Sequence, residues 1–277
     1  MGDEDTLVRY EVSEGVCTVS FDNPERRNAW SMDMERQYFS ALDQAAADDD
    51  VRVIVVTGAG RWFCPGLDSR RLEEAAGPVG LRLEGRRPQH YPLTIPKPMI
   101  AAVNGACAGI GLVQALVCDV RFMARGARVS TAYAKLGIPA EYGLSWILPR
   151  LIGVERALDL LLSARPVGAD EAERIGLVSR VCDPDTVVAE ATAYAGMLAT
   201  NCSPRSMATI RRQVWGDLSR GYTEANEVWL AAMRRLNRPE NPDFAEGVDA
   251  FVHQRTPQFA SLPPDFELPT LPPFARQ

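Results

Sequence analysis

Two apolar runs stand out from the polar pattern of the chain, and each has the length of a buried strand. The first is VRVIVVTGAG (51–60), which ends in glycines, and the second is Met99–Val103. Short apolar runs bounded by turn residues are typical of strands that are buried on both faces. After the second run come Asn104-Gly105, a row of small residues up to Gly111, and the apolar run Leu112–Val117. This order predicts a strand, a glycine-rich turn and a buried helix.

Strands alternate with helices in the first two thirds of the chain, and only helices follow. Residues 7–21 predict two strands joined at Glu14-Gly15, and Ser31 is a suitable N-cap for a helix that ends at Ala47. The pattern also predicts strands at 120–133 and 178–183, helices at 153–163, 168–176, 187–199, 204–215, 222–236 and 243–254, and an extended tail over the last twenty residues. We therefore expect an α/β core over residues 1–190 and a helical region with an extended tail over 191–277.

A glycine-rich turn between a strand and a helix can present backbone N–H groups to a ligand. The first N–H groups of a helix have no partner within it, and small side chains let a ligand approach the main chain. The turn Gly105–Gly111 has this composition, and FCPGLD (63–68) forms a second tight turn that a helix is expected to follow. The first turn is thus predicted to bind an anion or an oxyanion.

Composition narrows the classes of function. The formal net charge of −6 offers no basic face to nucleic acid, and no apolar run reaches the ~18 residues of a membrane span. The six cysteines form no CxxC pair and follow no secretory signal, so reduced thiols and a cytoplasmic location are expected. Because the chain has only two histidines, His90 and His253, a His-rich metal site is not expected.

The segment 69–92 is irregular and rich in arginine, including Arg70 and Arg86. The sequence leaves two interpretations open, a solvated segment or one that faces a phosphate group.

Four segments, taken in order, resemble the crotonase superfamily, the enoyl-CoA hydratases and isomerases. They are VIVVTGAGRWFCPGLD, IAAVNGACAGIGLVQALVCDVRF, GIPAEYGLSWILPRLIG and the A–EA–GLV pattern from Ala169 to Val178. The resemblance extends over roughly residues 7–260. It implies a spiral of β-β-α units with a C-terminal helical region that packs trimers, often as a dimer of trimers. It also implies an acyl-CoA thioester as the substrate, with no metal or redox cofactor.

By this resemblance, two backbone N–H groups form an oxyanion hole for the thioester carbonyl. The matching residues are Leu67, after the glycine of PGLD, and Ile110, in the glycine-rich turn. The physical argument agrees, because both lie at turns that open helices, where N–H groups are unpaired.

The acid–base residues depart from those of the hydratases that the chain resembles. Those enzymes carry two glutamates, and the matching positions here are Val113 and Tyr133. A third position, which is acidic in several isomerases of the superfamily, is Glu141. Hydration needs one group to activate water and another to protonate carbon, whereas one group can move a double bond. The resemblance therefore implies an isomerase with Glu141 as the proton shuttle, although Glu141 could instead only stabilise the start of the next helix.

The resemblance also implies the residues that contact coenzyme A and the acyl group. It places the backbone of residues 26–29 and the turn 64–68 against the adenine and pantetheine, Arg70 near the phosphates, and the end of the last helix near the 3′-phosphate. The expected contacts are Arg26, Asn28, Ala29, Cys64, Gly66, Asp68, Arg70, Gly109, Tyr133, Phe251 and Arg255.

Three alternatives stay open at this point. Gly105–Gly109 fits the pattern G-x-C-x-G, so Cys107 could be the nucleophile of a thiol hydrolase with His253 as its base. The chain could be a scaffold that binds acyl-CoA without turnover, since two of three acidic positions are lost. It could also be a hydratase in which Glu141 acts alone.

Overall fold

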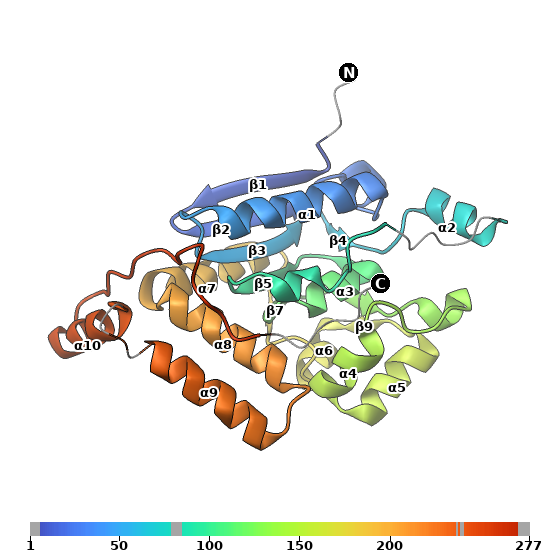
Figure 1. Cartoon of the computed structure of the whole chain (residues 1–277). Coiled ribbons are helices and arrows are strands. Elements are labelled where there is room, and N and C mark those ends of the chain that lie inside the picture. Colours follow the sequence, from blue (N-terminus) through green and yellow to red (C-terminus); the bar gives the residue numbers. More distant parts are fainter. Residues whose placement is uncertain (1–5, 79–84, 237, 239–240, 271–277) are drawn as a thin grey trace.

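In the part of the chain that the structure describes, ten strands form two sheets (Figure 1). The computed structural model describes residues 6–78, 85–236, 238 and 241–270. The larger sheet contains β1 (Val8–Ser13), β2 (Val16–Phe21), β3 (Val53–Gly58), β5 (Met99–Val103), β7 (Val120–Ala124) and β10 (Arg180–Cys182), and the smaller contains β4 (Trp62–Cys64), β6 (Ala106–Ala108), β8 (Arg128–Ser130) and β9 (Val167–Gly168). Their orders are β1-β2-β3-β5-β7-β10 and β4-β6-β8-β9.

Helices follow the strand pairs and then fill the C-terminal region. They are α1 (Met32–Ala47), α2 (Ser69–Ala76), α3 (Ile110–Leu116), α4 (Leu144–Ile152), α5 (Val154–Ser163), α6 (Ala169–Arg174), α7 (Val187–Asn201), α8 (Pro204–Asp217), α9 (Tyr222–Leu236) and α10 (Asp243–His253), with short 3-10 turns η1 (Pro24–Arg26), η2 (Tyr91–Thr94) and η3 (Tyr133–Leu136). As predicted, Ser31 caps α1, since its hydroxyl accepts a hydrogen bond from Met34 N at 3.1 Å.

The strand pairs make the chain a spiral. In the pairs β3/β4, β5/β6 and β7/β8, the first strand joins the larger sheet and the second joins the smaller one. Neighbouring strands of successive pairs run parallel in both sheets, and only β1/β2 and β8/β9 are antiparallel. The expected spiral of β-β-α units is confirmed.

Some predicted boundaries were wrong because the second strand of each pair is short. The single strand expected over 120–133 is two strands separated by a turn at Gly126, whose φ is +89°, and Tyr133 begins η3. The predicted turns at 63–68 and 105–111 each contain strand residues, because residues 62–64 and 106–108 pair with one another as β4 and β6. The helix α3 begins at Ile110 rather than Leu112. Three residues are too few to show an apolar period.

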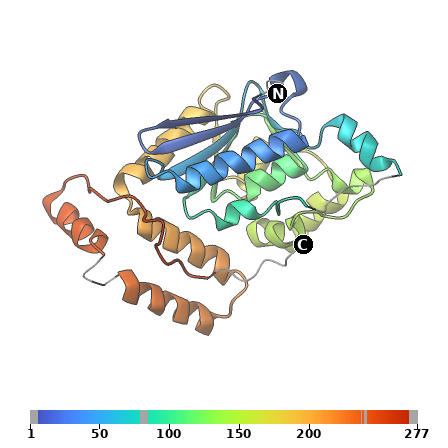
Figure 2. The ribbon, with the colours of Figure 1, turned by 45° about the horizontal axis from the view of Figure 1, so that its top comes forward.

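The strands at the centre of the larger sheet are buried along their whole length. Every residue of β3 and β5 is buried. α7 contacts β2, β3, β5 and β7, and α1 contacts β1 and β2 on the other side of the sheet (Figure 2). Because helices cover both faces, the strands need no polar side, which explains the continuous apolar runs.

α7 passes through residue 190, where we expect the division between the core and the helical region. That division stays a prediction. The tail of the chain, as far as the structure describes it (258–270), contains neither helix nor strand, and residues 271–277 lie outside the described part. Across the described ranges, no helix is both long and apolar enough to cross a membrane.

A buried arginine fastens α8 to the core. The guanidinium of Arg211 donates from Nε to Asp119 Oδ2 at 2.7 Å, and its other nitrogens donate to the carbonyl oxygens of Pro92 and Leu93, each at 3.0 Å. Asp119 Oδ2 also accepts from the backbone N of Met99, the first residue of β5, at 2.8 Å. The pair therefore joins the helical region to the central strand.

Replacing Arg211 with Met should lower the free energy of unfolding by about 3–5 kcal/mol, because Asp119 and buried carbonyl groups lose their partner. Arg156→Met, at an exposed position of α5, is the matched control and should change it by less than about 0.5 kcal/mol. Urea denaturation of both variants measures the difference, and equal values would show that Arg211 does not fasten the helix.

Candidate active site

Two glycine turns lie side by side at one edge of the smaller sheet. β4 and β6 run parallel, with Cys64 opposite Cys107. Gly66 follows the first strand and Gly109 follows the second. A Cβ atom placed on Gly66 would lie 3.3 Å from the carbonyl oxygen of Ala108, and one placed on Gly109 would lie 3.9 Å from the Cα of Gly66. The two predicted oxyanion donors, one residue beyond each glycine, are therefore neighbours.

The N–H of Leu67 points away from the strand pairing that holds its turn. Trp30 N donates to the carbonyl oxygen of Gly66 at 2.8 Å, and Asp68 N donates to that of Trp30 at 3.1 Å. In extended backbone, a residue between two such bonds directs its own N–H to the opposite side. Among the residues that the structure describes, this N–H has no acceptor.

The N–H of Ile110 is unpaired for a different reason. Ile110 is the first residue of α3, and the N-cap Gly109 has a φ of +52°, which a residue with a side chain rarely adopts. The carbonyl of Gly109 accepts from Val113 N at 3.1 Å, as in the first turn of any helix. The Ile110 N–H has no acceptor within the described ranges. Two adjacent unpaired N–H groups are the arrangement that an oxyanion hole requires.

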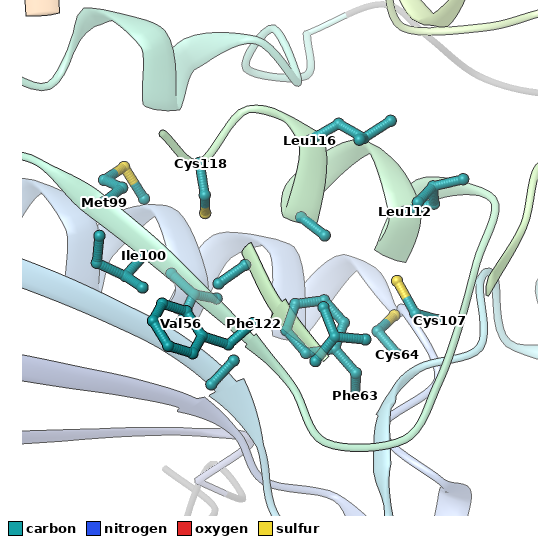
Figure 3. Packing of buried hydrophobic residues seen from close by; sticks show 14 of the residues in the cluster. Val56, Phe63, Cys64, Met99, Ile100, Cys107, Leu112, Leu116, Cys118 and Phe122 are labelled. Atoms are coloured by element: carbon teal, nitrogen blue, oxygen red, sulfur yellow. The ribbon is translucent and has the colours of Figure 1, made fainter. Parts of the chain in front are cut away.

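Other glycines allow the backbones at this edge to approach so closely. A Cβ atom on Gly111 would lie 2.1 Å from the carbonyl oxygen of Cys64, and one on Gly105 would lie 2.0 Å from that of Arg61. The side chains of Cys64 and Cys107 lie close together below α3 (Figure 3). Both are fully buried, so only their backbone can face a substrate.

Glu141 lies in a tight turn before α4. Its carbonyl oxygen accepts from Leu144 N at 3.1 Å, and its side chain is half-buried. Burial raises the pKa of the Glu141 carboxyl above its ordinary value, and the charge of Arg86 opposes this rise. A carboxylate with a raised pKa suits a group that takes and returns a proton near neutral pH.

Tyr133 lies close enough to Glu141 to interact with its charge, and it follows a strand that bonds to the second glycine turn. Ser130, at the end of β8, accepts a hydrogen bond from Gly109 N at 3.1 Å, and Tyr133 follows three residues later. The Tyr133 hydroxyl is buried and has no hydrogen-bond partner among the described residues. Burial raises its pKa, and the charge of Glu141 adds to this. The hydroxyl therefore stays protonated and can donate.

The family follows from comparison with known proteins. A family model described as enoyl-CoA hydratase/isomerase matches residues 11–262. The chain belongs to this enoyl-CoA hydratase/isomerase family. It is 34% identical over 264 residues to 1,2-epoxyphenylacetyl-CoA isomerase of Escherichia coli K12, a match that covers 91% of this chain and 98% of that protein.

Solved structures of enoyl-CoA hydratases share the fold. The enzyme from Bacillus anthracis superposes with a TM-score of 0.84 at 26% identity, covering 92% of this chain and 99% of that one. An enoyl-CoA hydratase from Mycobacterium marinum is 46% identical, with a TM-score of 0.67 and coverage of 77% and 99%.

In this family member, the segments expected to hold coenzyme A on the N-terminal side lie together. Arg26 forms an ion pair with Asp68 at 2.6 Å, and Asp68 caps α2 by accepting from Arg70 N at 3.0 Å. The Asn28 side chain donates to the carbonyl oxygens of Ala59 at 3.0 Å and Trp62 at 2.7 Å, so it holds this loop to the β3–β4 turn. The Arg70 side chain is exposed, and the N–H of Ala29 bonds to the carbonyl oxygen of Arg26.

Phe251 and Arg255 lie far from these segments. α10 is at the opposite end of the molecule from α2 in both ribbon views (Figures 1 and 2). Phe251 is 85% exposed, and Arg255 pairs with Glu246 at 2.7 Å and with Asp249. A single chain does not bring these two residues to the glycine turns, and their expected contact with a phosphate stays a prediction.

The thiol hydrolase interpretation is wrong. Cys107 is fully buried, and burial raises its pKa well above the ordinary value. His253 is exposed at the end of α10, where it bonds to Asp249. Nor does any group of three or more His, Cys, Asp and Glu side chains in the described part of the chain have the geometry of a metal site.

The sequence did not reveal the partners of Arg86. It is neither solvated nor directed at a phosphate, because its side chain is only 5% exposed and pairs with Glu35. The two residues are separated by 51 positions, and Tyr142, a third member of the group, lies 56 positions beyond Arg86. No local pattern could have related them. The neighbouring residues 79–84 of this segment lie outside the described part.

Gly111→Ala should push α3 away from Cys64, because its Cβ would meet a backbone oxygen. We expect a loss of about 1–3 kcal/mol of stability and a fall in turnover of about 100-fold as the two N–H groups separate. Gly196→Ala is the control, since this glycine in α7 has nothing within 4 Å and alanine should stabilise the helix by about 0.5–1 kcal/mol. Thermal melting and turnover of an enoyl-CoA measure both effects, and full turnover in Gly111→Ala would contradict the close approach.

Proposed function

We propose that this protein moves the double bond of an enoyl-CoA thioester, with Glu141 as the proton shuttle. The observation that carries the proposal is the combination of two adjacent unpaired N–H groups with a single half-buried carboxylate of raised pKa. Leu67 and Ile110 donate to the thioester oxygen. Glu141 removes a proton from one carbon of the acyl chain and returns it to another.

The oxyanion hole supplies the stabilisation of the intermediate. Removing a proton next to the thioester moves negative charge onto its oxygen and gives an enolate. Backbone donors are fixed before the reaction, so they need no reorganisation as the charge develops, and each contributes about 3 kcal/mol. The side chains of Leu67 and Ile110 take no part, which is why apolar residues serve there.

The number of acid–base groups favours isomerisation. Val113 has no titratable group, and the Tyr133 hydroxyl is held protonated. A single carboxylate can move a proton between two carbons, whereas hydration is best served by two. One relative at 34% identity is named as a 1,2-epoxyphenylacetyl-CoA isomerase and another at 35% as a probable enoyl-CoA hydratase, so the proposal of isomerisation rests on the acid–base groups.

Hydration with Glu141 acting alone is the second candidate. The observation that favours it is the free Tyr133 hydroxyl, which lies close enough to Glu141 for their charges to interact and could hold a water molecule with it. A non-catalytic acyl-CoA scaffold is the third.

We also propose assembly as a trimer or a dimer of trimers, through the helical region. α9 and α10 expose large apolar side chains, among them Trp229, Phe244 and Phe251, and burial of exposed apolar side chains is what drives most association between subunits. Such an assembly could bring the end of α10 to the site of another subunit. In this proposal coenzyme A is part of the substrate and the enzyme needs no metal or redox cofactor.

Glu141→Gln should lower the isomerisation of a 3-enoyl-CoA by about 10²–10⁴-fold while leaving CoA binding intact, because the amide cannot accept a proton. Turnover of a 3-enoyl-CoA and a 2-enoyl-CoA, with CoA affinity from calorimetry, separates the candidates. In the wild type, fast hydration of the 2-enoyl-CoA would support the hydratase, and binding without turnover of either ester would support the scaffold. Undiminished isomerisation of the 3-enoyl-CoA by Glu141→Gln would exclude Glu141 as the base.

Tyr133→Phe should stabilise the free protein by about 1–3 kcal/mol, because it removes a buried hydroxyl that lacks a partner. If that hydroxyl also meets the substrate, as the resemblance to the superfamily implies, turnover should fall at the same time. Melting temperature and turnover are measured together. A variant that is more stable and fully active would show that Tyr133 only fills the core.

A further inference from the structure

A buried ion pair links Glu35, near the start of α1, to Arg86, which lies in the segment before η2. Arg86 Nε donates to Glu35 Oε1 at 3.0 Å, and a second guanidinium nitrogen donates to Glu35 Oε2. The side chains are 5% and 4% exposed. Glu35 also accepts from the indole N–H of Trp30 at 2.9 Å. The carboxylate is thus fixed from two sides, and it holds the guanidinium in one orientation.

The third nitrogen of this guanidinium bonds to the loop that carries Glu141. Arg86 Nη1 donates to the hydroxyl of Tyr142 at 3.1 Å, and the guanidinium lies 5.8 Å from the centre of the tyrosine ring. Tyr142 directly follows Glu141 and has a φ of +52°. A left-handed conformation at a bulky residue costs about 1–3 kcal/mol and persists only where its surroundings hold it. Tyr142 packs against the hydrophobic core, and Arg86 supplies the hydrogen bond that fixes its hydroxyl.

The group also sets the charge around Glu141. Facing its carboxylate are Arg86 from the segment before η2, Tyr133 of η3, and Tyr142 of its own loop, with Glu35 of α1 behind Arg86. Both tyrosines are neutral, because burial raises the pKa of each. Among the described residues, Arg86 is therefore the charge that acts on Glu141, and its ion pair with Glu35 reduces this effect.

A purely stabilising role would be a weak reason for this pair. The cost of removing two charges from water is of the same size as their attraction, so a buried ion pair often contributes no net stability. Such a pair does fix the orientation of both side chains, because its two parallel hydrogen bonds form in one arrangement. Here the fixed guanidinium also bonds to Tyr142, the residue next to the proposed base.

We propose that Arg86 and Glu35 are positioning residues for Glu141: they hold the 141–143 loop through Tyr142 and balance the charge that sets the proton affinity of the base. The proposal rests on the proposed function, because it assigns a role to Glu141. The two residues act in opposite senses. Arg86 favours the ionised carboxylate of Glu141, and Glu35 weakens that effect by neutralising Arg86.

The acid limb of the kcat/KM profile tests the electrostatic part, because the base must be ionised to act. Arg86→Gln removes the cation, so the pKa of Glu141 should rise and the acid limb should move to higher pH by roughly 1 unit. Glu35→Gln leaves the cation uncompensated, so the limb should move to lower pH. Arg86→Lys keeps the charge and should leave the limb in place while lowering kcat. A general loss of structure could not move the acid limb to higher pH in Arg86→Gln and to lower pH in Glu35→Gln.

Tyr142→Phe tests the positioning part without changing any charge. It should lower kcat, because the loop loses its hydrogen bond, and it should not move the acid limb. The matched control is the exposed pair Arg87–Asp43, which joins the same two segments at 2.7 Å. Arg87→Gln and Asp43→Asn should both leave the acid limb where it is.

The outcomes are distinct from failure of the proposed function, which Glu141→Gln tests. If Glu141→Gln is inactive but the limbs of Arg86→Gln and Glu35→Gln stay in place, only the electrostatic role is overturned. If Tyr142→Phe keeps full kcat, the positioning role is overturned. Circular dichroism shows whether each variant is folded. Should Arg86→Gln not fold, the direction of the shift in Glu35→Gln decides, and a shift to higher pH overturns the proposal.

Discussion

The site depends on how closely two turns and one helix approach through their backbones. β4 and β6 lie side by side, and the start of α3 rests on the carbonyl oxygen of Cys64 at a position where only glycine fits. Strand pairing leaves the Leu67 N–H free on one turn, and the helix start leaves the Ile110 N–H free on the other. Hydrogen-bond donors of the main chain are rigid because the strands that carry them are buried in the core. This constraint explains why the residues at the two donor positions can be apolar.

The acid–base side of the site is built in a different way. Glu141 lies in a loop, and its properties follow from side chains that come from other parts of the chain. Burial disfavours its charged form, whereas the Arg86 guanidinium favours it. Glu35, deep in the interior, holds that guanidinium with two hydrogen bonds. The balance between these opposing effects gives a carboxyl group with a raised pKa that can still ionise, as a proton shuttle requires.

The helical region is attached to the core by hydrogen bonds at several places, among them those from Arg52 to the carbonyl oxygens of Ala199 and Phe259. Arg211 of α8 bonds to Asp119 and to the backbone before β5, and α7 packs over the larger sheet. α10 lies far from the glycine turns and exposes Phe251. The match to the enoyl-CoA hydratase/isomerase family model extends over residues 11–262, which include both the spiral core with its two glycine turns and the last helix.

The sequence by itself determined the central strands, most helices, the family and the glycine turns, because apolar period, caps and glycine-rich turns are local signals. Ser31 caps α1 as expected, and β5 has the expected bounds. The strands β4 and β6 were missed, since so short a segment carries no period, and neither interpretation of the segment 69–92 describes Arg86. Only the tertiary structure decided that Arg86 is buried against Glu35, that Cys107 is inaccessible, and that the Leu67 and Ile110 turns are neighbours. These facts depend on contacts between residues far apart in the chain, which the fold brings together and no local pattern records.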